Sequence, residues 1–206
     1  MKEKKPTEAQ PVDRKWETYE LLHDMIYILA AVLVIFVFLI RMVSVKGPSM
    51  LPTLVDGDRL TLLSNTLYTE PKQGDVVVAS VPTYNDGENI VKRVIATAGQ
   101  EVDIRYEAGV GTVYVDGEAL EEPYINEPMQ PTSYAPIEFP VTVPEDCVFV
   151  MGDNRNHSAD SRYPEIGIFD ENYVMGKVLM IVWPGRKDES DKRQFGRIGV
   201  VHGWEN

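Results

Sequence analysis

The chain has 206 residues, of which 44% are hydrophobic and 25% are charged, as in a globular protein rather than a disordered one. Its 32 acidic and 20 basic residues give a net charge of −12 at pH 7, and residues 46–206 alone contain 26 acidic and 14 basic side chains. This acidity argues against a nucleic-acid partner, because binding to phosphates requires clustered basic residues.

A long apolar run lies near the N-terminus. The 16 residues Met25–Ile40 contain no charge, and the run continues to Val45 with only Arg41 interrupting it. As a helix, residues 25–45 would be roughly 30 Å long, which is the thickness of a hydrocarbon core. Arg41 lies near the far end, where its long side chain can reach the headgroups. We therefore predict a single transmembrane helix over residues 25–45, with a helix buried in a soluble core as the alternative.

Basic residues precede the apolar run, so a cleavable signal peptide is the other alternative. The run begins too late for one, and no Ala-x-Ala cleavage site follows it, which favours an anchor that is retained. Residues 1–24 carry 5 basic side chains and residues 41–60 carry 3. The positive-inside rule thus favours a cytoplasmic tail over residues 1–24 and places residues 46–206 outside the cytoplasm.

The remainder of the chain has the pattern of a mainly β, antiparallel domain. From Asp58 onward, short β-type runs are punctuated by Gly, Pro, Asn and Asp, and only residues 51–68 leave room for a short helical turn. Residues 115–118, VDGE, have the sequence of a hairpin turn. Residues 101–146 contain a stretch rich in Pro, Glu and Tyr, which predicts a small inserted hairpin or loop subdomain. The expected strands contain the segments DRLTLL, GDVVVASV, NIVKRVIA, EVDIRY, GTVYVDGEAL, FPVTV, CVFVMG and YVMGKVLMIVW.

Cys147 is the only cysteine, and it lies in one of these apolar runs. An internal disulfide therefore cannot form, and we expect a buried thiol.

Ser49 lies in the segment VKGPSMLPTL, a few residues after the apolar run. Serine is a weak nucleophile unless a base within hydrogen-bond reach accepts its proton. The Gly-Pro pair before it is ordinary turn chemistry, so the alternative is that Ser49 is a structural turn residue.

A candidate base lies in the segment NIVKRVIA. In a strand, Ile90, Lys92 and Val94 share one face, and Val91 and its alternating neighbours share the other. A lysine on an apolar face loses hydration of its charged form, so its pKa falls and the neutral amine can act as a general base. The alternative is an edge-strand lysine whose amine extends into water.

A third polar segment, GDNRNHSADSRYPEIG, follows the strand CVFVM. One interpretation is a loop network in which Asp153 or Asp160 pairs with Arg155 or Arg162. A metal site formed by Asp153, His157 and Asp160 is disfavoured, because the segment has one histidine and no histidine or cysteine pair at ligand spacing.

The order of apolar anchor, GPSMLPTL, GDVVV, VKRVIATAGQ and GDNRNHSADSR resembles the bacterial type I signal peptidases, which are membrane-tethered serine proteases with a Ser-Lys dyad. The resemblance extends from Met25 to Trp183. It implies that Ser49 is the nucleophile, that Lys92 is the general base, and that Arg93 has no catalytic role. Supporting positions implied by the resemblance are Met50 after the nucleophile, Ser158 as the hydroxyl that orients the lysine amine, and Asp153, Asp160 and Arg162 in the supporting loop.

The chain departs from the family pattern at two positions. Some members have a serine two residues before the nucleophile that helps to bind the oxyanion, and here that position is Gly47. The oxyanion hole would then depend on backbone N–H groups, with that of Ser49 as the first candidate, since Pro48 has none. His157 stands where relatives carry Asn or Asp, which leaves a Ser-His pairing open as an alternative, although Lys92 is retained.

The resemblance implies a signal peptidase that removes signal peptides from exported preproteins after small residues, at the outer face of the bacterial cytoplasmic membrane. Preproteins and the lipid bilayer are then its partners, and no metal or cofactor is required. A dedicated processing or self-cleaving peptidase of the same fold is one alternative. A membrane-anchored β module that binds a partner without catalysis is the other.

Overall fold

The computed structural model describes residues 14–38, 40–131, 137–186 and 192–203. The chain separates into two compact units, residues 1–37 and 38–206, and we describe each by itself. Residues 1–13 of the predicted tail lie outside the described residues, as does part of the stretch rich in Pro, Glu and Tyr, residues 132–136.

The N-terminal unit contains helix α1, Arg14–Phe38. Its apolar side chains from Met25 to Val34 are exposed, with Ile26 at 65% and Leu33 at 55%. Within the described ranges, no helix combines the length and the hydropathy needed to cross a membrane.

The helix ends earlier than the sequence indicated. Instead of continuing to Val45, the chain forms strand β1, Ile40–Ser44, which pairs antiparallel with β2, Arg59–Ser64. The physical reason is burial: Val45 is 4% exposed in the core of the β domain, and Val43 packs against the same cluster. A helix over these residues would withdraw both valines from that core.

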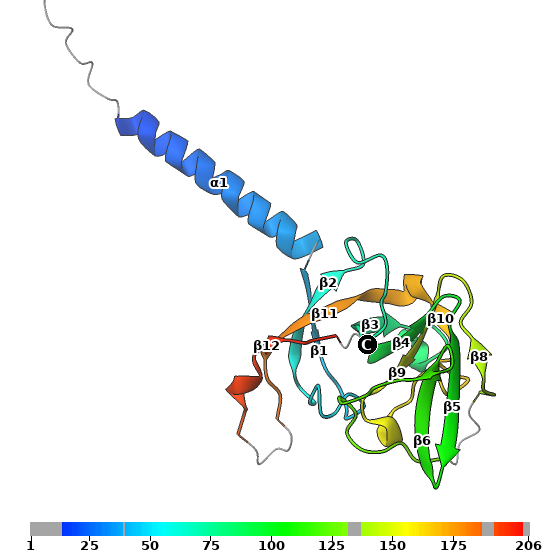
Figure 1. Ribbon diagram of the computed structural model, residues 1–206. Helices are drawn as coiled ribbons and strands as arrows, with labels where there is room; N and C mark the ends of the chain where they lie inside the picture. Colours follow the sequence, from blue (N-terminus) through cyan, green and yellow to red (C-terminus); the bar gives the residue numbers. More distant parts are fainter. Residues whose placement is uncertain (1–13, 39, 132–136, 187–191, 204–206) are drawn as a thin grey trace, which may run out of the picture. The chain divides into compact units, whose positions relative to one another are not determined.

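The main sheet is antiparallel and has the strand order β1-β2-β11-β3-β4-β9-β10 (Figure 1). Outside this order, β12 pairs with β11. This sheet confirms the predicted mainly β, antiparallel architecture. Strands that are distant in sequence become neighbours here, because the long β11 pairs with β2, β3 and β12. The remaining strands are β3 (Val76–Ser80), β4 (Asn89–Thr97), β9 (Cys147–Met151), β10 (Phe169–Asp170), β11 (Val174–Trp183) and β12 (Gly199–Val200).

A second, four-stranded sheet corresponds to the predicted insertion and has the order β7-β6-β5-β8 (Figure 1). The VDGE segment forms the turn between β6 and β7. Asp116 has φ 52° and Gly117 has φ 83°, the left-handed conformations that such a turn requires. The strands are β5 (Glu101–Glu107), β6 (Val110–Val115), β7 (Glu118–Ala119) and β8 (Val141–Thr142). Short 3-10 turns lie at Asn85–Gly87, Arg155–His157, Glu171–Tyr173 and Phe195–Arg197.

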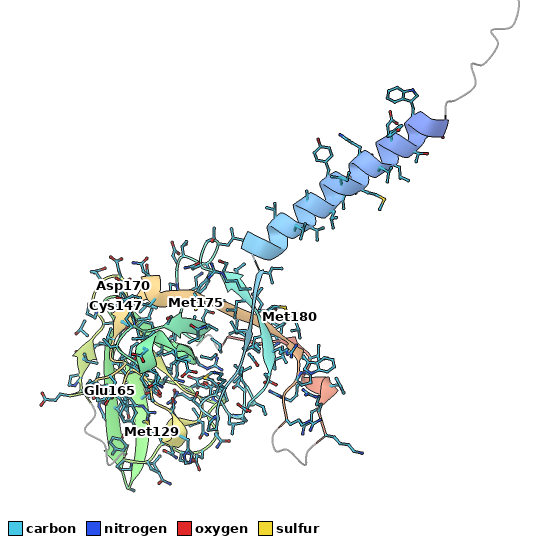
Figure 2. All side chains as sticks on the ribbon, turned by 180° about the vertical axis from the view of Figure 1, so that it is seen from behind. Met129, Cys147, Glu165, Asp170, Met175 and Met180 are labelled. Atoms are coloured by element: carbon cyan, nitrogen blue, oxygen red, sulfur yellow. The ribbon has the colours of Figure 1, made fainter. Side chains whose placement is uncertain are left out.

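The two sheets share a hydrophobic core. Ile95 and Phe149 of the main sheet pack in one cluster with Val102 and Val113 of the small sheet, and all four are at most about 1% exposed. Cys147 packs at the edge of this cluster and is half-buried rather than fully buried, opposite Asp170 in the register of β9 and β10 (Figure 2). This shared core fixes the small sheet against the strands that carry the polar site.

Candidate active site

Ser49 and Lys92 meet although 43 residues separate them. Ser49 lies in the turn that follows β1, and Lys92 lies in β4. The Lys92 Nζ atom donates hydrogen bonds to Ser49 Oγ at 2.9 Å and to the Val91 carbonyl at 3.0 Å. Among the described residues, these are the hydrogen bonds of the amine, and neither of them is to a carboxylate. The geometry is that of a serine beside its proton acceptor.

Burial sets the charge state of the amine. Lys92 is 5% exposed, and this loss of hydration lowers the pKa of Lys92 to about 8. The carboxylates of Asp160 and Asp153 raise the pKa, and the guanidinium of Arg162 lowers it, but desolvation is the largest effect. A substantial fraction of the amine is therefore neutral near physiological pH and can accept a proton from Ser49.

The backbone around Ser49 is held from the polar loop after β9. Asn154 donates its backbone N–H to the Ser49 carbonyl at 3.0 Å, and its Nδ2 donates to the Pro48 carbonyl at 3.1 Å. Within the described residues, the Ser49 N–H has no acceptor, so it remains available to an oxyanion. Gly47 has φ +80° and donates its N–H to Asp56 Oδ1 at 2.7 Å, which explains a glycine at this position.

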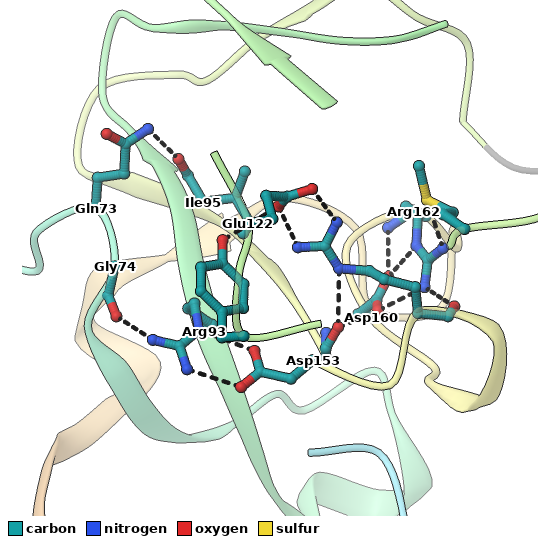
Figure 3. Close-up of polar contacts among 12 residues, drawn as sticks. Gln73, Gly74, Arg93, Ile95, Glu122, Asp153, Asp160 and Arg162 are labelled. Carbon is teal, nitrogen blue, oxygen red and sulfur yellow. Dashed lines mark hydrogen bonds and ion pairs between the residues drawn. The ribbon is translucent and has the colours of Figure 1, made fainter. Parts of the chain in front are cut away.

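Asp153 pairs with an arginine on a different strand, which the sequence did not indicate. Arg93 donates to both carboxylate oxygens of Asp153, at 2.8 and 2.7 Å, and both side chains are almost completely buried (Figure 3). The Thr53 hydroxyl also donates to Asp153, and the Tyr124 ring covers the Arg93 guanidinium at 4.0 Å. This cluster connects the turn that contains Ser49, the strand of Lys92 and the polar loop.

Asp160 forms the second buried pair, with Arg162 in its own loop (Figure 3). Arg162 donates to the two carboxylate oxygens at 2.7 and 2.9 Å, and the Gly152 N–H donates at 3.0 Å. Burial alone would raise the pKa of Asp160, but the charge and the hydrogen bonds of Arg162 outweigh it and lower the pKa. Arg155 pairs instead with Glu122, from the segment after β7, so the small sheet's chain also braces this loop.

Among the described residues, Ser158 does not form a hydrogen bond with the Lys92 amine. Its Oγ donates to the Ala159 carbonyl at 3.4 Å, whereas the amine bonds to Ser49 and Val91. Ser158 is 8% exposed and packs on Gly152. The sequence did not single out Gly152, Asn154 or Thr53, because their importance depends on contacts across the fold.

His157 is an exposed residue in the lining of the groove that contains Ser49. Its side chain is 66% exposed, and its Nε2 lies 3.9 Å from Glu127 Oε1. The hydrogen bond to Ser49 Oγ comes from Lys92 instead. Among the described residues, no three His, Cys, Asp or Glu side chains are grouped to hold a metal ion.

A groove of about 590 Å³ leads to Ser49 and Lys92. One wall consists of β1 and residues 45–49, and the other consists of residues 88–92. Valine and isoleucine side chains form much of its lining, while Met50, 1% exposed, packs in the core rather than in the groove. Such a groove suits an extended, mainly apolar peptide.

Comparison with known proteins gives consistent matches. The family model described as "Signal peptidase, peptidase S26" matches residues 18–183. The chain is 33% identical over 186 residues to Signal peptidase I of Bacillus licheniformis, covering 86% of this chain and 95% of the relative. It is 34% identical over 189 residues to Signal peptidase I of Bacillus amyloliquefaciens, covering 88% and 94%. It is also 39% identical over 150 residues to Probable signal peptidase I-1 of Synechocystis, covering 69% and 71%.

Among solved structures, the crystal structure of a signal peptidase I from Enterococcus faecalis matches with a TM-score of 0.40 and 30% sequence identity. The match covers 52% of this chain and 96% of that chain.

Replacing Gly152 with alanine tests the close packing behind Ser49. The added Cβ would lie 2.3 Å from Ser158 Oγ and 2.5 Å from the Ser49 carbonyl oxygen, so the backbone must shift. We expect a loss of about 1–3 kcal/mol in the free energy of unfolding. Displacing the serine should also slow its acylation by about 100-fold. Gly196→Ala is the matched control, because open space surrounds Gly196, and an equal effect of both variants would contradict the packing explanation.

The pH dependence of Ser49 acylation tests the charge state of Lys92. Because only the neutral amine accepts a proton, the rate should rise with pH and level off above a pKa of about 8. The measurement is the rate of labelling by a serine-acylating probe, followed by intact mass across this pH range. A rate that levels off near the ordinary pKa of histidine would instead indicate an imidazole base.

Proposed function

The chain belongs to the signal peptidase family, peptidase S26, and we propose that Ser49 and Lys92 form the dyad with which it hydrolyses preproteins. It is a serine endopeptidase that cleaves signal peptides from exported preproteins. The single observation that supports this dyad is the 2.9 Å hydrogen bond between a buried, uncompensated amine and Ser49 Oγ. A module that only binds a partner would not need this arrangement.

The dyad operates by proton transfer in both half-reactions. Neutral Lys92 accepts the Ser49 proton as Oγ attacks the scissile carbonyl, and the resulting ammonium donates this proton to the leaving amine. A water molecule then attacks the acyl-enzyme, with Lys92 again as the base, and releases the signal peptide. The Ser49 N–H, which has no acceptor among the described residues, would supply one oxyanion donor. Asp153, Asp160 and Arg162 position these groups through their buried ion pairs.

The groove supports binding of the substrate as an extended strand. β1 ends the strand order of the main sheet, and its chain continues directly into one wall of the groove. Val45, Ile90 and Val91 line this space, and their fixed, branched side chains leave room for small residues beside the cleaved bond. We therefore propose that the shape of this groove limits cleavage to sites that follow small residues.

The membrane arrangement is also a proposal. The charge-free run Met25–Ile40 supports a single-pass anchor, and Ser49 lies nine residues after it. A substrate held in the same bilayer would then reach the dyad by lateral diffusion. With a cytoplasmic N-terminus, the β domain lies at the outer face of the bacterial cytoplasmic membrane, where exported preproteins emerge.

Comparing two variants distinguishes lysine from histidine as the base. Lys92→Ala should lower the cleavage rate of a preprotein by about 10²–10⁴-fold, because general-base assistance is lost while the fold persists. His157→Asn should retain most of the rate, because His157 is exposed and paired with Glu127 rather than with Ser49. The measurement is the initial rate in detergent, with the cut mapped by mass and folding checked by circular dichroism. Substantial activity in a folded Lys92→Ala protein would refute the dyad, whereas Ser49→Ala is inactive under either base.

Protease accessibility tests the topology. Protease added to intact spheroplasts should digest the β domain and leave a cytoplasmic marker protein intact, because only the domain is outside. Complete protection of the domain, with digestion after the cells are lysed, would reverse the orientation.

A further inference from the structure

One ion pair spans the groove between its two walls. Lys46, which follows β1, donates from Nζ to Glu88 Oε1 at 3.1 Å, and Glu88 directly precedes β4. Both residues line the groove, and 42 residues separate them in sequence. The pair therefore lies in the path of any peptide that occupies the groove.

The pair has a defined position relative to the dyad. Glu88 has extended backbone angles, φ −57° and ψ 138°, so strand alternation places it on the same side as Ile90 and Lys92. Glu88 precedes Lys92 by four residues, which corresponds to roughly 13 Å of strand. On the opposite wall, Lys46 precedes Ser49 by three residues, and the turn at Gly47 shortens that distance below the roughly 10 Å of an extended segment. An extended substrate would thus bring a side chain about three residues from the cleaved bond to this pair.

Lys46 and Glu88 carry most of the charge among the residues that line this part of the groove. Of the described residues that line the groove, the Lys, Arg, Asp and Glu residues are Lys46, Glu88 and Lys92, and Lys92 is hydrogen-bonded to Ser49. Their neighbours in the lining are mostly apolar or uncharged, such as Val43, Val45 and Asn89. Removing one member of the pair would leave an uncompensated charge facing the substrate.

The pair is also easily opened. The side chains of Lys46 and Glu88 are 82% and 50% exposed, and ion pairs this exposed add little to stability. A charged side chain of the substrate can therefore replace Lys46 as the partner of Glu88, or Glu88 as the partner of Lys46. A surface ion pair without a role in binding is the alternative, and it predicts no effect on substrate choice.

We propose that Lys46 and Glu88 together determine which charge the enzyme accepts on the preprotein about three residues from the cleaved bond. While they neutralise one another, the subsite favours uncharged side chains and does not distinguish acidic from basic ones. This inference rests on the proposed function, because it requires that the peptide lie in this groove.

The experiment compares Lys46→Gln, Glu88→Gln and the charge-swapped double variant K46E/E88K in the full chain, solubilised in an uncharged detergent. The substrates are cleavable signal-peptide sequences that carry Asp, Gln or Lys at one of the second to fifth residues on either side of the cut. The readout is the ratio of kcat/KM for the Asp and Lys peptides. Arg105→Gln is the matched control, because Arg105 forms an exposed ion pair with Asp103 on β5, outside the groove lining.

At one substrate position, Glu88→Gln should raise the Asp-to-Lys ratio about threefold to fivefold, and Lys46→Gln should lower it by a similar factor. The charge-swapped variant should restore the wild-type ratio, and 1 M salt should reduce all the shifts by screening. Arg105→Gln should leave the ratio unchanged.

Wild-type ratios in both single variants, measured with protein that cleaves the Gln peptides, would overturn this inference and leave the proposed function intact. Equal shifts in Arg105→Gln would also overturn it, since the effect would then be one of net charge. If the wild-type protein cleaved none of the peptides, the proposed function and the inference would both fail. Thermal unfolding of each variant checks that its fold is kept.

Discussion

The site depends on burying a lysine amine in a β-sheet without giving it a counter-ion of its own. Lys92 is 5% exposed, and the two buried carboxylates nearby are already committed, Asp153 to Arg93 and Asp160 to Arg162. Desolvation is the largest effect on the pKa of Lys92 and lowers it, while Asp160 and Asp153 raise it and Arg162 lowers it. The net result is a lowered pKa although two carboxylates lie nearby.

The same ion pairs also hold the residues of the site in position. The bond from Arg93 to Asp153 joins β4 to the loop after β9, and the hydroxyl of Thr53 joins that loop to the nucleophile turn. Asn154 completes the connection through the carbonyl of Ser49. Because Arg93, Asp153 and Asn154 are buried and each has a partner, shifting one of them would leave others unsatisfied in a low-dielectric interior. Such a network holds Ser49 and Lys92 at hydrogen-bonding distance before any substrate binds.

The sequence predicts those parts of the structure that depend on local chemistry. Alternation in NIVKRVIA places Lys92 among aliphatic residues, and VDGE specifies its hairpin turn. Contacts across the fold have no local signal: Asp153 has two arginines in its own loop, yet it binds Arg93, 60 residues away. The end of α1 at Phe38 is similarly non-local, because the apolar residues after it suit a helix or a strand equally well until the core offers Val43 and Val45 a place.

The strand pairing explains why the chemistry lies at the end of the groove. β4 pairs with β3 along Asn89–Arg93, but in the described structure its pairing with β9 begins only at Arg93 and Met151. The preceding residues therefore expose an unpaired edge toward the groove, and β1 is the terminal strand on the other side. Unpaired edges normally invite aggregation, but here a bound peptide would supply the missing strand. Lys92 is the last residue of that open edge, so under the proposed function a peptide that extended the sheet would end its pairing beside Lys92 and Ser49.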